Sequence, residues 1–393
     1  MRTSLGPIAA LPAGATGMSF APTPACYHGG AFFEAIGEEF DALSRLATVI
    51  NADVLDAWFP PSPRVLDAIQ AHLPLLVRTS PPAACAGLVR AIARVRGVEP
   101  ANVLPGGGSS DLIFLALTNW LTRSSRVLIL DPMYGEYSHV LERVIGCRVD
   151  RLVLPRSAGY QLDPAALAER LRTARYDLAI MVNPNSPTGR HASRVSLEDA
   201  IAQASPSTRV WIDETYIDYV QGRESLERFA AARDGVIVCK SMSKVYALSG
   251  LRVGYLCGSA ATIDSLRGFN PPWAIGLVAQ VAAVAALGDW AYYEARWAAT
   301  HALRRALAAG LTRLGIDVVP GVANFLLCHL PVSGPDARAL VQAARMHDLF
   351  LREVSSMGRS LGPHAVRIAV KDAATNARML HILGRLLRDG ALG

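Results

Sequence analysis

The chain has 393 residues, of which 51% are hydrophobic, 7% aromatic and 18% charged. A chain of this size and composition can bury one large core and a smaller second one, which excludes an intrinsically disordered protein. The net charge of +6 is spread over arginine-rich segments such as residues 90–96, which argues against a nucleic-acid-binding protein. The N-terminal segment is apolar but interrupted by glycine and proline. We therefore expect no membrane helix, no secretion signal and a cytoplasmic location.

The cysteines give no sign of a metal site. They occur singly, as Cys26, Cys85, Cys147, Cys239, Cys257 and Cys328. Without a Cys-x-x-Cys pair the chain lacks the spacing of a zinc site or a redox motif, so we expect buried free thiols and no metal.

Strand-like and helical patterns alternate through the middle of the chain. In order, we expect a strand at 127–130, a helix at 135–145, a strand at 149–154, a helix at 164–173, a strand at 178–182, a helix at 197–204, and strands at 210–213, 236–239 and 254–257. Such alternation predicts an α/β fold with a mostly parallel sheet flanked by helices. An alanine-rich helical region, residues 276–314, then leads into a second domain. We expect an N-terminal arm (1–50), a large domain (51–285) and a small C-terminal α/β domain (286–393).

The segment from Ser241 to Arg252 carries the most informative group of side chains. Lys244 could form a Schiff base with an aldehyde, while the Ser241 and Ser243 hydroxyls and the Arg252 guanidinium could bind a dianionic phosphate. An aldehyde and a phosphate on one ligand indicate pyridoxal 5'-phosphate as the cofactor.

Two further motifs lie at the ends of expected strands. Asp213 ends the run at 210–213 and is followed by Tyr216. A carboxylate beside a pyridine nitrogen keeps the nitrogen protonated and makes the ring an electron sink, and a nearby phenol could hydrogen-bond the ring hydroxyl. The turn at 183–189, Asn-Pro-Asn-Ser-Pro-Thr-Gly, follows the strand at 178–182. Open parallel sheets bind ligands at the carboxyl ends of their strands.

The order of these three motifs resembles class I/II aminotransferases of pyridoxal-phosphate fold type I. Within that group the chain is most similar to the branch of histidinol-phosphate aminotransferases and threonine-phosphate decarboxylases, from about residue 28 to the C-terminus. The resemblance implies a fold type I transferase, a homodimer with shared active sites, and an amino acid as the small-molecule substrate.

The resemblance also implies roles for individual residues. The cofactor phosphate is expected at a helix start formed by Gly108, Ser109 and Ser110, which is a favourable anion site. Tyr134 is expected to stack on the pyridine ring. For the substrate, Arg367 is expected to hold the α-carboxylate in a bidentate fork, with Asn324 nearby.

The chain departs from the family pattern at three places. Ser186 stands where relatives have an asparagine that binds the ring hydroxyl, and Asn185 could take over this contact. Residues 78–82, Arg-Thr-Ser-Pro-Pro, lack the tyrosine that in relatives reaches the partner's cofactor. The loop at 51–63 is longer, more acidic and more aromatic than in relatives, and we expect Asp53 and Trp58 in it to face the substrate.

Two clues to the substrate disagree. His28, in His-Gly-Gly, resembles a segment of threonine-phosphate decarboxylases that helps form the phosphate end of the substrate pocket. Asp53 and Asp56 would instead repel a phosphate and attract an amine or a guanidinium. We give the acidic loop more weight because it would line the pocket directly.

We therefore expect an aminotransferase-like enzyme acting on an L-amino acid through an external aldimine and a quinonoid, with Lys244, Asp213 and Tyr216 as catalytic residues. The alternatives are a decarboxylase of a phosphorylated amino acid, and an enzyme of specialised metabolism that eliminates or cyclises a basic amino acid. The bond that stands perpendicular to the cofactor ring decides among these outcomes.

Overall fold

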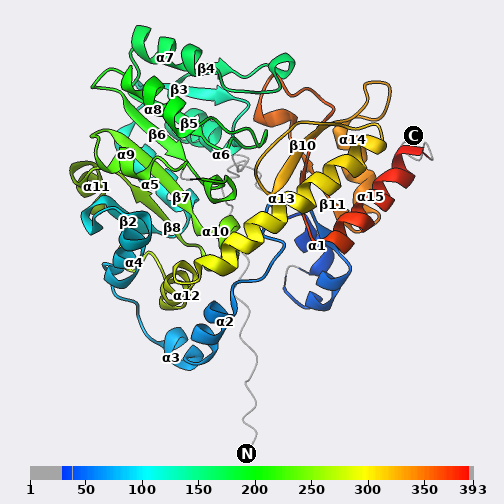
Figure 1. The fold of residues 1–393 in the computed structure, drawn as a ribbon, viewed down its shortest axis with the longest axis horizontal. Helices are drawn as coiled ribbons and strands as arrows, with labels where there is room; N and C mark the ends of the chain where they lie inside the picture. Colours follow the sequence, from blue (N-terminus) through cyan, green and yellow to red (C-terminus); the bar gives the residue numbers. More distant parts are fainter. Residues whose placement is uncertain (1–28, 38, 223, 389–393) are drawn as a thin grey trace, which may run out of the picture.

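The computed structural model describes residues 29–37, 39–222 and 224–388, which form two main sheets with helices around them (Figure 1). The strands of the larger sheet are β2 (Val103–Gly106), β3 (Arg126–Asp131), β4 (Arg148–Val153), β5 (Leu178–Val182), β6 (Arg209–Asp213), β7 (Val236–Ser241) and β8 (Gly254–Cys257). Their spatial order is β2-β8-β7-β6-β5-β3-β4, and β8 runs against both of its neighbours while the strands from β7 to β4 are parallel. The predicted α/β fold with a mostly parallel sheet is confirmed.

The helices before, between and after these strands begin and end where local signals place them. They are α4 (Ala86–Arg96), α5 (Ser109–Trp120), α6 (Gly135–Ser138) continued by a π-helical turn (His139–Ile145), α7 (Pro164–Thr173), α8 (Arg194–Ala202), α9 (Glu227–Ala231), α10 (Met242–Val245) and α11 (Ala260–Arg267). In α7, Asp163 caps the helix by accepting a hydrogen bond from Ala165 N, and Pro164 occupies the first turn, where its missing N–H costs nothing. α8 begins three residues before the predicted start because Ser193 caps it.

The alanine-rich region is two helices rather than one. α12 (Leu277–Leu287) ends at Gly288, and α13 (Trp290–Arg313) begins after Asp289. α12 packs against α4 and α2 (Pro63–Gln70), whereas α13 runs from the larger sheet to the smaller one (Figure 1). No helix in the described part of the chain is long and apolar enough to cross a membrane.

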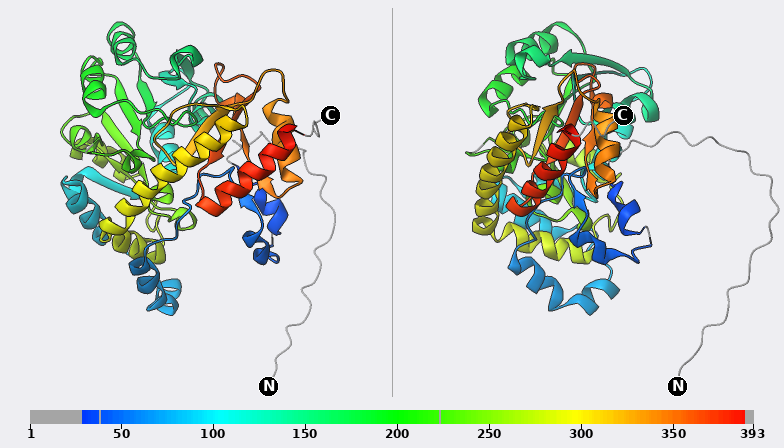
Figure 2. Two further views of the ribbon diagram at one scale, coloured as in Figure 1. Left: turned by 45° about the vertical axis from the view of Figure 1, so that its right-hand side comes forward. Right: turned by 90° about the vertical axis from the view of Figure 1, so that its right-hand side faces the viewer.

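The smaller sheet is antiparallel and has the order β12-β13-β10-β9. Its strands are β9 (Asp317–Val318), β10 (Phe325–His329), β12 (Arg352–Glu353) and β13 (Ala365–Ala369). The helices α13 and α15 (Ala373–Arg388) lie side by side here, and α14 (Ala337–Arg345) packs against α15 (Figure 2). The boundaries given above for the domains stay a prediction.

A segment from near the N-terminus lies along this smaller sheet. β1 (Ile50–Asn51) pairs in parallel with β11 (Leu349–Phe350). In the 52–56 segment that follows, Ala52 O accepts a hydrogen bond from Ala369 N at 3.0 Å. Ala52 and Ala369, which are more than 300 positions apart in the sequence, are therefore neighbours in the structure.

In the larger sheet, the first turn of α5 lies close against β8. A Cβ atom on Gly254 would lie 2.8 Å from Lys240 O, 2.9 Å from Gly108 C and 3.0 Å from Ser109 N. All three are backbone atoms that cannot turn aside, so only glycine lets the first turn of α5 approach the sheet this closely.

The substitution Gly254→Ala tests this contact. We expect it to lower the free energy of unfolding by ~1–3 kcal/mol, as overpacking usually does, and to weaken binding of an anion at the start of α5. Gly250→Ala is the matched control, because a Cβ atom there meets nothing within 4 Å. Urea unfolding of both variants measures the effect, and equal stability of the two would contradict the prediction.

Candidate active site

The lysine segment follows β7 and turns sharply. Ser241 caps α10 by accepting a hydrogen bond from Ser243 N at 3.3 Å, and α10 carries Lys244. Arg252 has a φ of 53°, and its Nη1 donates to Ser243 Oγ at 3.1 Å and to Ser249 O at 3.0 Å. The turn thus folds the guanidinium back onto the serine next to the lysine.

This guanidinium also meets the start of α5. Gly108 has a φ of +99°, and a Cβ atom on it would lie 2.6 Å from Arg252 Nη2. The backbone N–H groups at the start of α5, from Ser109 onward, therefore lie close to the Arg252 guanidinium and the Ser243 hydroxyl. A helix N-terminus and a guanidinium together favour an anion of the size and charge of a phosphate. The Ser110 hydroxyl donates to the Glu136 carboxylate at 2.9 Å.

Asp213 lies at the end of β6 and is buried. It accepts hydrogen bonds from Tyr137 Oη at 2.8 Å and from the N and Oγ1 atoms of Thr215 at 2.9 and 2.7 Å. Burial raises the pKa of this carboxyl group, and the three donors oppose that change. Trp211 Nε1 in turn donates to Tyr137 Oη at 2.7 Å, so the phenol is fixed from both sides.

The aromatic and polar side chains around Asp213 come from three elements. Tyr134 precedes α6 and lies edge-on to Tyr137, with 6.2 Å between the ring centroids. Tyr216 is buried against Phe325 of β10, and burial raises the pKa of its phenol. Asn185 is buried and its Nδ2 donates to Pro132 O at 3.0 Å. One of the two amide N–H donors of Asn185 is therefore used within the protein.

Arg367 of β13 approaches the same region from the smaller sheet. It is buried, its Nη1 donates to Ser186 Oγ at 3.2 Å, and its Nη2 donates to Asp53 O at 3.1 Å. Its guanidinium also lies over the Phe325 ring. Burial lowers the pKa of Arg367. Asn324, which precedes β10, is fully buried and donates from Nδ2 to Leu55 O at 2.9 Å.

In the acidic loop at 51–63, Asp56 contacts lysine side chains of the same chain. Asp56 Oδ1 accepts a hydrogen bond from Lys244 Nζ at 2.9 Å, so in this structure its charge is paired with the lysine of the chain. Asp53 is buried and accepts a hydrogen bond from Gly30 N at 3.0 Å. Trp58 donates from Nε1 to Thr300 Oγ1 of α13 at 2.8 Å. His28 lies outside the described residues, and the substrate contacts of these side chains stay a prediction.

Several groups at the site were missed by the sequence analysis. Tyr137 and Glu136 carried no motif of their own. Lys371 did have a signal, because the chain contains only three lysines, Lys240, Lys244 and Lys371, and arginine supplies every other basic charge of the Lys+Arg total. Lys371 Nζ donates to Asp56 O at 3.4 Å, so two of the three lysines meet at one aspartate.

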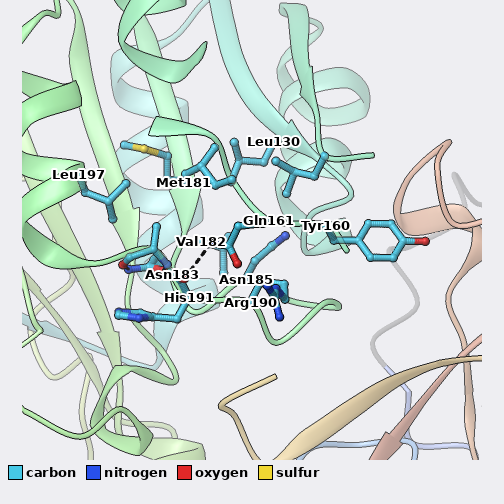
Figure 3. A pocket seen from close by; sticks show the side chains of 13 residues that line it. Leu130, Tyr160, Gln161, Met181, Val182, Asn183, Asn185, Arg190, His191 and Leu197 are labelled. Atoms are coloured by element: carbon cyan, nitrogen blue, oxygen red, sulfur yellow. Dashed lines mark hydrogen bonds between the residues drawn. The ribbon is translucent and has the colours of Figure 1, made fainter. Parts of the chain in front are cut away.

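A small cavity lies behind the turn that follows β5 (Figure 3). It is lined by Leu130, Leu154, Tyr160, Gln161, Leu162, Met181, Val182, Asn183, Asn185, Arg190, His191, Ala192 and Leu197. Of the predicted cofactor residues only Asn185 lines it, and most of its wall is apolar. It is therefore separate from the group of charged side chains around Lys244.

Comparison with known proteins decides the family. The sequence profile described as aminotransferase class I and II matches residues 55–386. The chain belongs to this family. Enzymes of the family use pyridoxal 5'-phosphate, so the protein is a pyridoxal-phosphate-dependent aminotransferase, as predicted.

Curated relatives point to the predicted branch. Histidinol-phosphate aminotransferase 2 of Dechloromonas aromatica is 33% identical over 318 residues, which is 78% of this chain and 85% of the relative. Histidinol-phosphate aminotransferase 2 of Pseudomonas aeruginosa is 29% identical over 354 residues, or 90% of this chain and 91% of the relative.

Solved aminotransferase structures share the fold. Histidinol-phosphate aminotransferase from Sinorhizobium meliloti in complex with pyridoxal 5'-phosphate has a TM-score of 0.80 at 20% identity and covers 95% of this chain and 98% of its own. N-succinyldiaminopimelate aminotransferase from Mycobacterium tuberculosis has a TM-score of 0.76 at 26% identity, covering 91% and 100%.

The residues present fit the cofactor of the family. The space at Gly108 that a Cβ atom would fill lies against Arg252, where a phosphate would sit, and Asp213 supplies a buried carboxylate for the pyridine nitrogen. When bound, pyridoxal 5'-phosphate supplies an aldehyde and an electron-withdrawing ring. The individual residue assignments stay predictions.

The substitution Tyr137→Phe tests how Asp213 is held. It removes one donor from a buried carboxylate and leaves Trp211 Nε1 without its acceptor, so we expect the free energy of unfolding to fall by ~1–3 kcal/mol. Tyr176→Phe is the control. It removes a hydrogen bond to Asp150, whose side chain is 30% exposed, and we expect a loss of at most ~1 kcal/mol. Urea unfolding without cofactor measures both, and a smaller loss at Tyr137 would refute the prediction.

Proposed function

We propose that this aminotransferase removes the amino group from an L-amino acid or a closely related amine whose anionic group is bound by Arg367. The observation that supports this is the state of Arg367. Its guanidinium is buried, its hydrogen-bond acceptors are a hydroxyl and a backbone carbonyl, and among the described residues it forms no ion pair with a carboxylate. A buried cation without a direct ion pair is costly, and a substrate anion would supply that ion pair.

A second arginine lies directly beside it. Arg352 of β12 is opposite Arg367 in the antiparallel register, so the two side chains leave the sheet on the same face. Arg352 is buried as well, and its charge is one cause of the lowered pKa of Arg367, after burial. Two neighbouring guanidinium groups favour an anion that can bind both, such as a carboxylate or a phosphate.

The names of the relatives agree with an anionic substrate. Several are histidinol-phosphate aminotransferases, whose named substrate carries a phosphate. We therefore place phosphorylated amines and acidic amino acids before basic amino acids as candidate substrates.

The chain's own residues would divide the work as follows. Lys244 would bind the cofactor aldehyde, and its free amine would move the proton at the substrate α carbon. Asp213 holds the ring nitrogen. One N–H of Asn185 is bound to Pro132 O, and we assign the hydrogen bond to the ring hydroxyl to Tyr216 and to the second N–H of Asn185. Ser243, Arg252 and the first turn of α5 hold the phosphate.

The homodimer is also part of the proposal. The short helix α3 (Leu73–Arg78) exposes the apolar side chains of Leu73, Leu75 and Val77, by 45%, 48% and 71%. This helix leads into residues 78–82, the segment expected to reach the partner subunit.

Product analysis tests the reaction type. We expect purified enzyme with histidinol phosphate or an L-amino acid, and 2-oxoglutarate as amino acceptor, to form glutamate and the corresponding carbonyl product, detected by mass spectrometry. Carbon dioxide with a retained amine would instead establish the decarboxylase alternative. A cyclised or eliminated product would establish the third alternative.

The substitution Arg367→Gln tests the anion site. We expect kcat/KM to fall 30- to 1000-fold, mainly through KM, which corresponds to a loss of ~2–4 kcal/mol of binding. Arg126→Gln removes an arginine of an exposed ion pair with Asp150 and should leave kcat/KM unchanged. An equal effect of both substitutions, or none of Arg367→Gln, would exclude Arg367 as the anion-binding residue.

A further inference from the structure

Lys244 has an immediate neighbour that reaches it from the other sheet. Asp56 belongs to the 52–56 segment, which is fixed to the smaller sheet, and its Oδ1 lies 2.9 Å from Lys244 Nζ on α10 of the larger one. The two residues are 188 positions apart in the sequence. This ion pair therefore joins the two halves of the molecule at the reactive amine.

The 52–56 segment is held in place by the smaller sheet. Arg367 Nη2 donates to Asp53 O, Asn324 Nδ2 to Leu55 O, and Lys371 Nζ to Asp56 O. Three successive contacts of this kind leave the backbone at Asp56 little freedom. They direct its carboxylate toward Lys244.

Lys371 is fixed as firmly as the segment it binds. It follows β13, its backbone N donates to Asn376 Oδ1 at 2.9 Å, and its backbone O accepts a hydrogen bond from Asn376 Nδ2 at 2.7 Å. Asp372, next in the chain, caps α15 through Thr375. A half-buried lysine in such a turn is unusual in a chain that uses arginine almost everywhere else, and lysine differs from arginine in that burial readily changes its protonation.

The charges around the amine oppose one another. The charged groups that face Lys244 are Asp56 from the 52–56 segment, Arg252 from the turn after α10, Arg367 from β13 and Lys371 from the turn after it. Burial lowers the pKa of Lys244, and Asp56 opposes this. Burial also lowers the pKa of Lys371, to about 8. Although burial alone would raise the pKa of Asp56, Lys244 and Lys371 lower it, so Asp56 carries its charge.

We propose that Asp56 and Lys371 are positioning residues for the reactive lysine, with Asp56 holding the Lys244 amine and retaining its proton, and Lys371 holding Asp56 and opposing that retention. This inference rests on the proposed role of Lys244 as the residue that binds the cofactor. The pair would decide at which pH Lys244 becomes the neutral amine that can react.

The small number of lysines makes a direct test practical. Lysine labelled with 13C at the ε carbon, incorporated during expression of the full-length chain, gives three signals whose chemical shifts follow protonation. Lys244→Ala assigns the Lys244 signal. A pH titration of the cofactor-free protein then gives, for each variant, the pH at which Lys244 is half protonated, which is its midpoint.

The two substitutions should move this midpoint in opposite directions. Asp56→Asn removes a stabilising negative charge and should lower the midpoint by about one unit, the low end for a charge at this distance because the Asp56 side chain is 37% exposed. Lys371→Met removes a repelling positive charge and should raise it. Asp264→Asn is the control, since it loses the same charge at a carboxylate that is 79% exposed and pairs with Arg267, and it should leave the midpoint unchanged.

The outcomes separate this inference from the proposed function. Midpoints of Lys244 that stay constant, or that move in the same direction in both variants, would overturn it. If Asp56→Asn does not fold, Lys371→Met still decides by the sign of its shift. On addition of pyridoxal 5'-phosphate the Lys244 signal should move away as its amine becomes an imine. If a different lysine signal moves, the assignment of Lys244 fails, whatever the titrations show.

Discussion

Charged groups taken out of water need partners, and this requirement organises the active site. Four charged side chains at the site are shielded from solvent: Lys244, Arg367, Asp213 and Lys371. The charge of each is stabilised by different partners. Asp213 receives three hydrogen bonds within the larger sheet. Lys244 and Lys371 share Asp56. Arg367 is left with neutral acceptors, which is why we assign the substrate anion to it.

A second group of buried charges lies near the ends of β6 and β7, close to the segment that carries Lys244. Arg96 donates from Nη1 and Nη2 to the two carboxylate oxygens of Asp218, both at 3.0 Å, and Lys240 lies within 4 Å of Glu214, Asp218 and Glu227. Burial raises the pKa of Glu214 to about 7 despite the nearby Lys240. This buried group of charges ties the ends of β6 and β7 to α4 and so supports the backbone that carries Lys244.

The two sheets contribute different parts of the chemistry. The residues that we assign to the cofactor lie near the carboxyl ends of the parallel strands of the larger sheet, where open parallel sheets commonly bind ligands. Arg367 and Arg352, which we assign to the substrate, belong to the smaller sheet. The 52–56 segment connects the two, since its backbone follows the smaller sheet while Asp56 reaches the lysine of the larger one.

The sequence by itself determined the family, the cofactor and the parallel sheet, because these depend on patterns that are local in the chain. The strand at 178–182, the helix at 164–173 and the motif from Ser241 to Arg252 are each complete within a few residues. Only the tertiary structure decided that Asp56 pairs with Lys244, and that Tyr137 holds Asp213. These partners lie 188 and 76 positions apart, and no local pattern reports a contact between side chains that folding alone brings together.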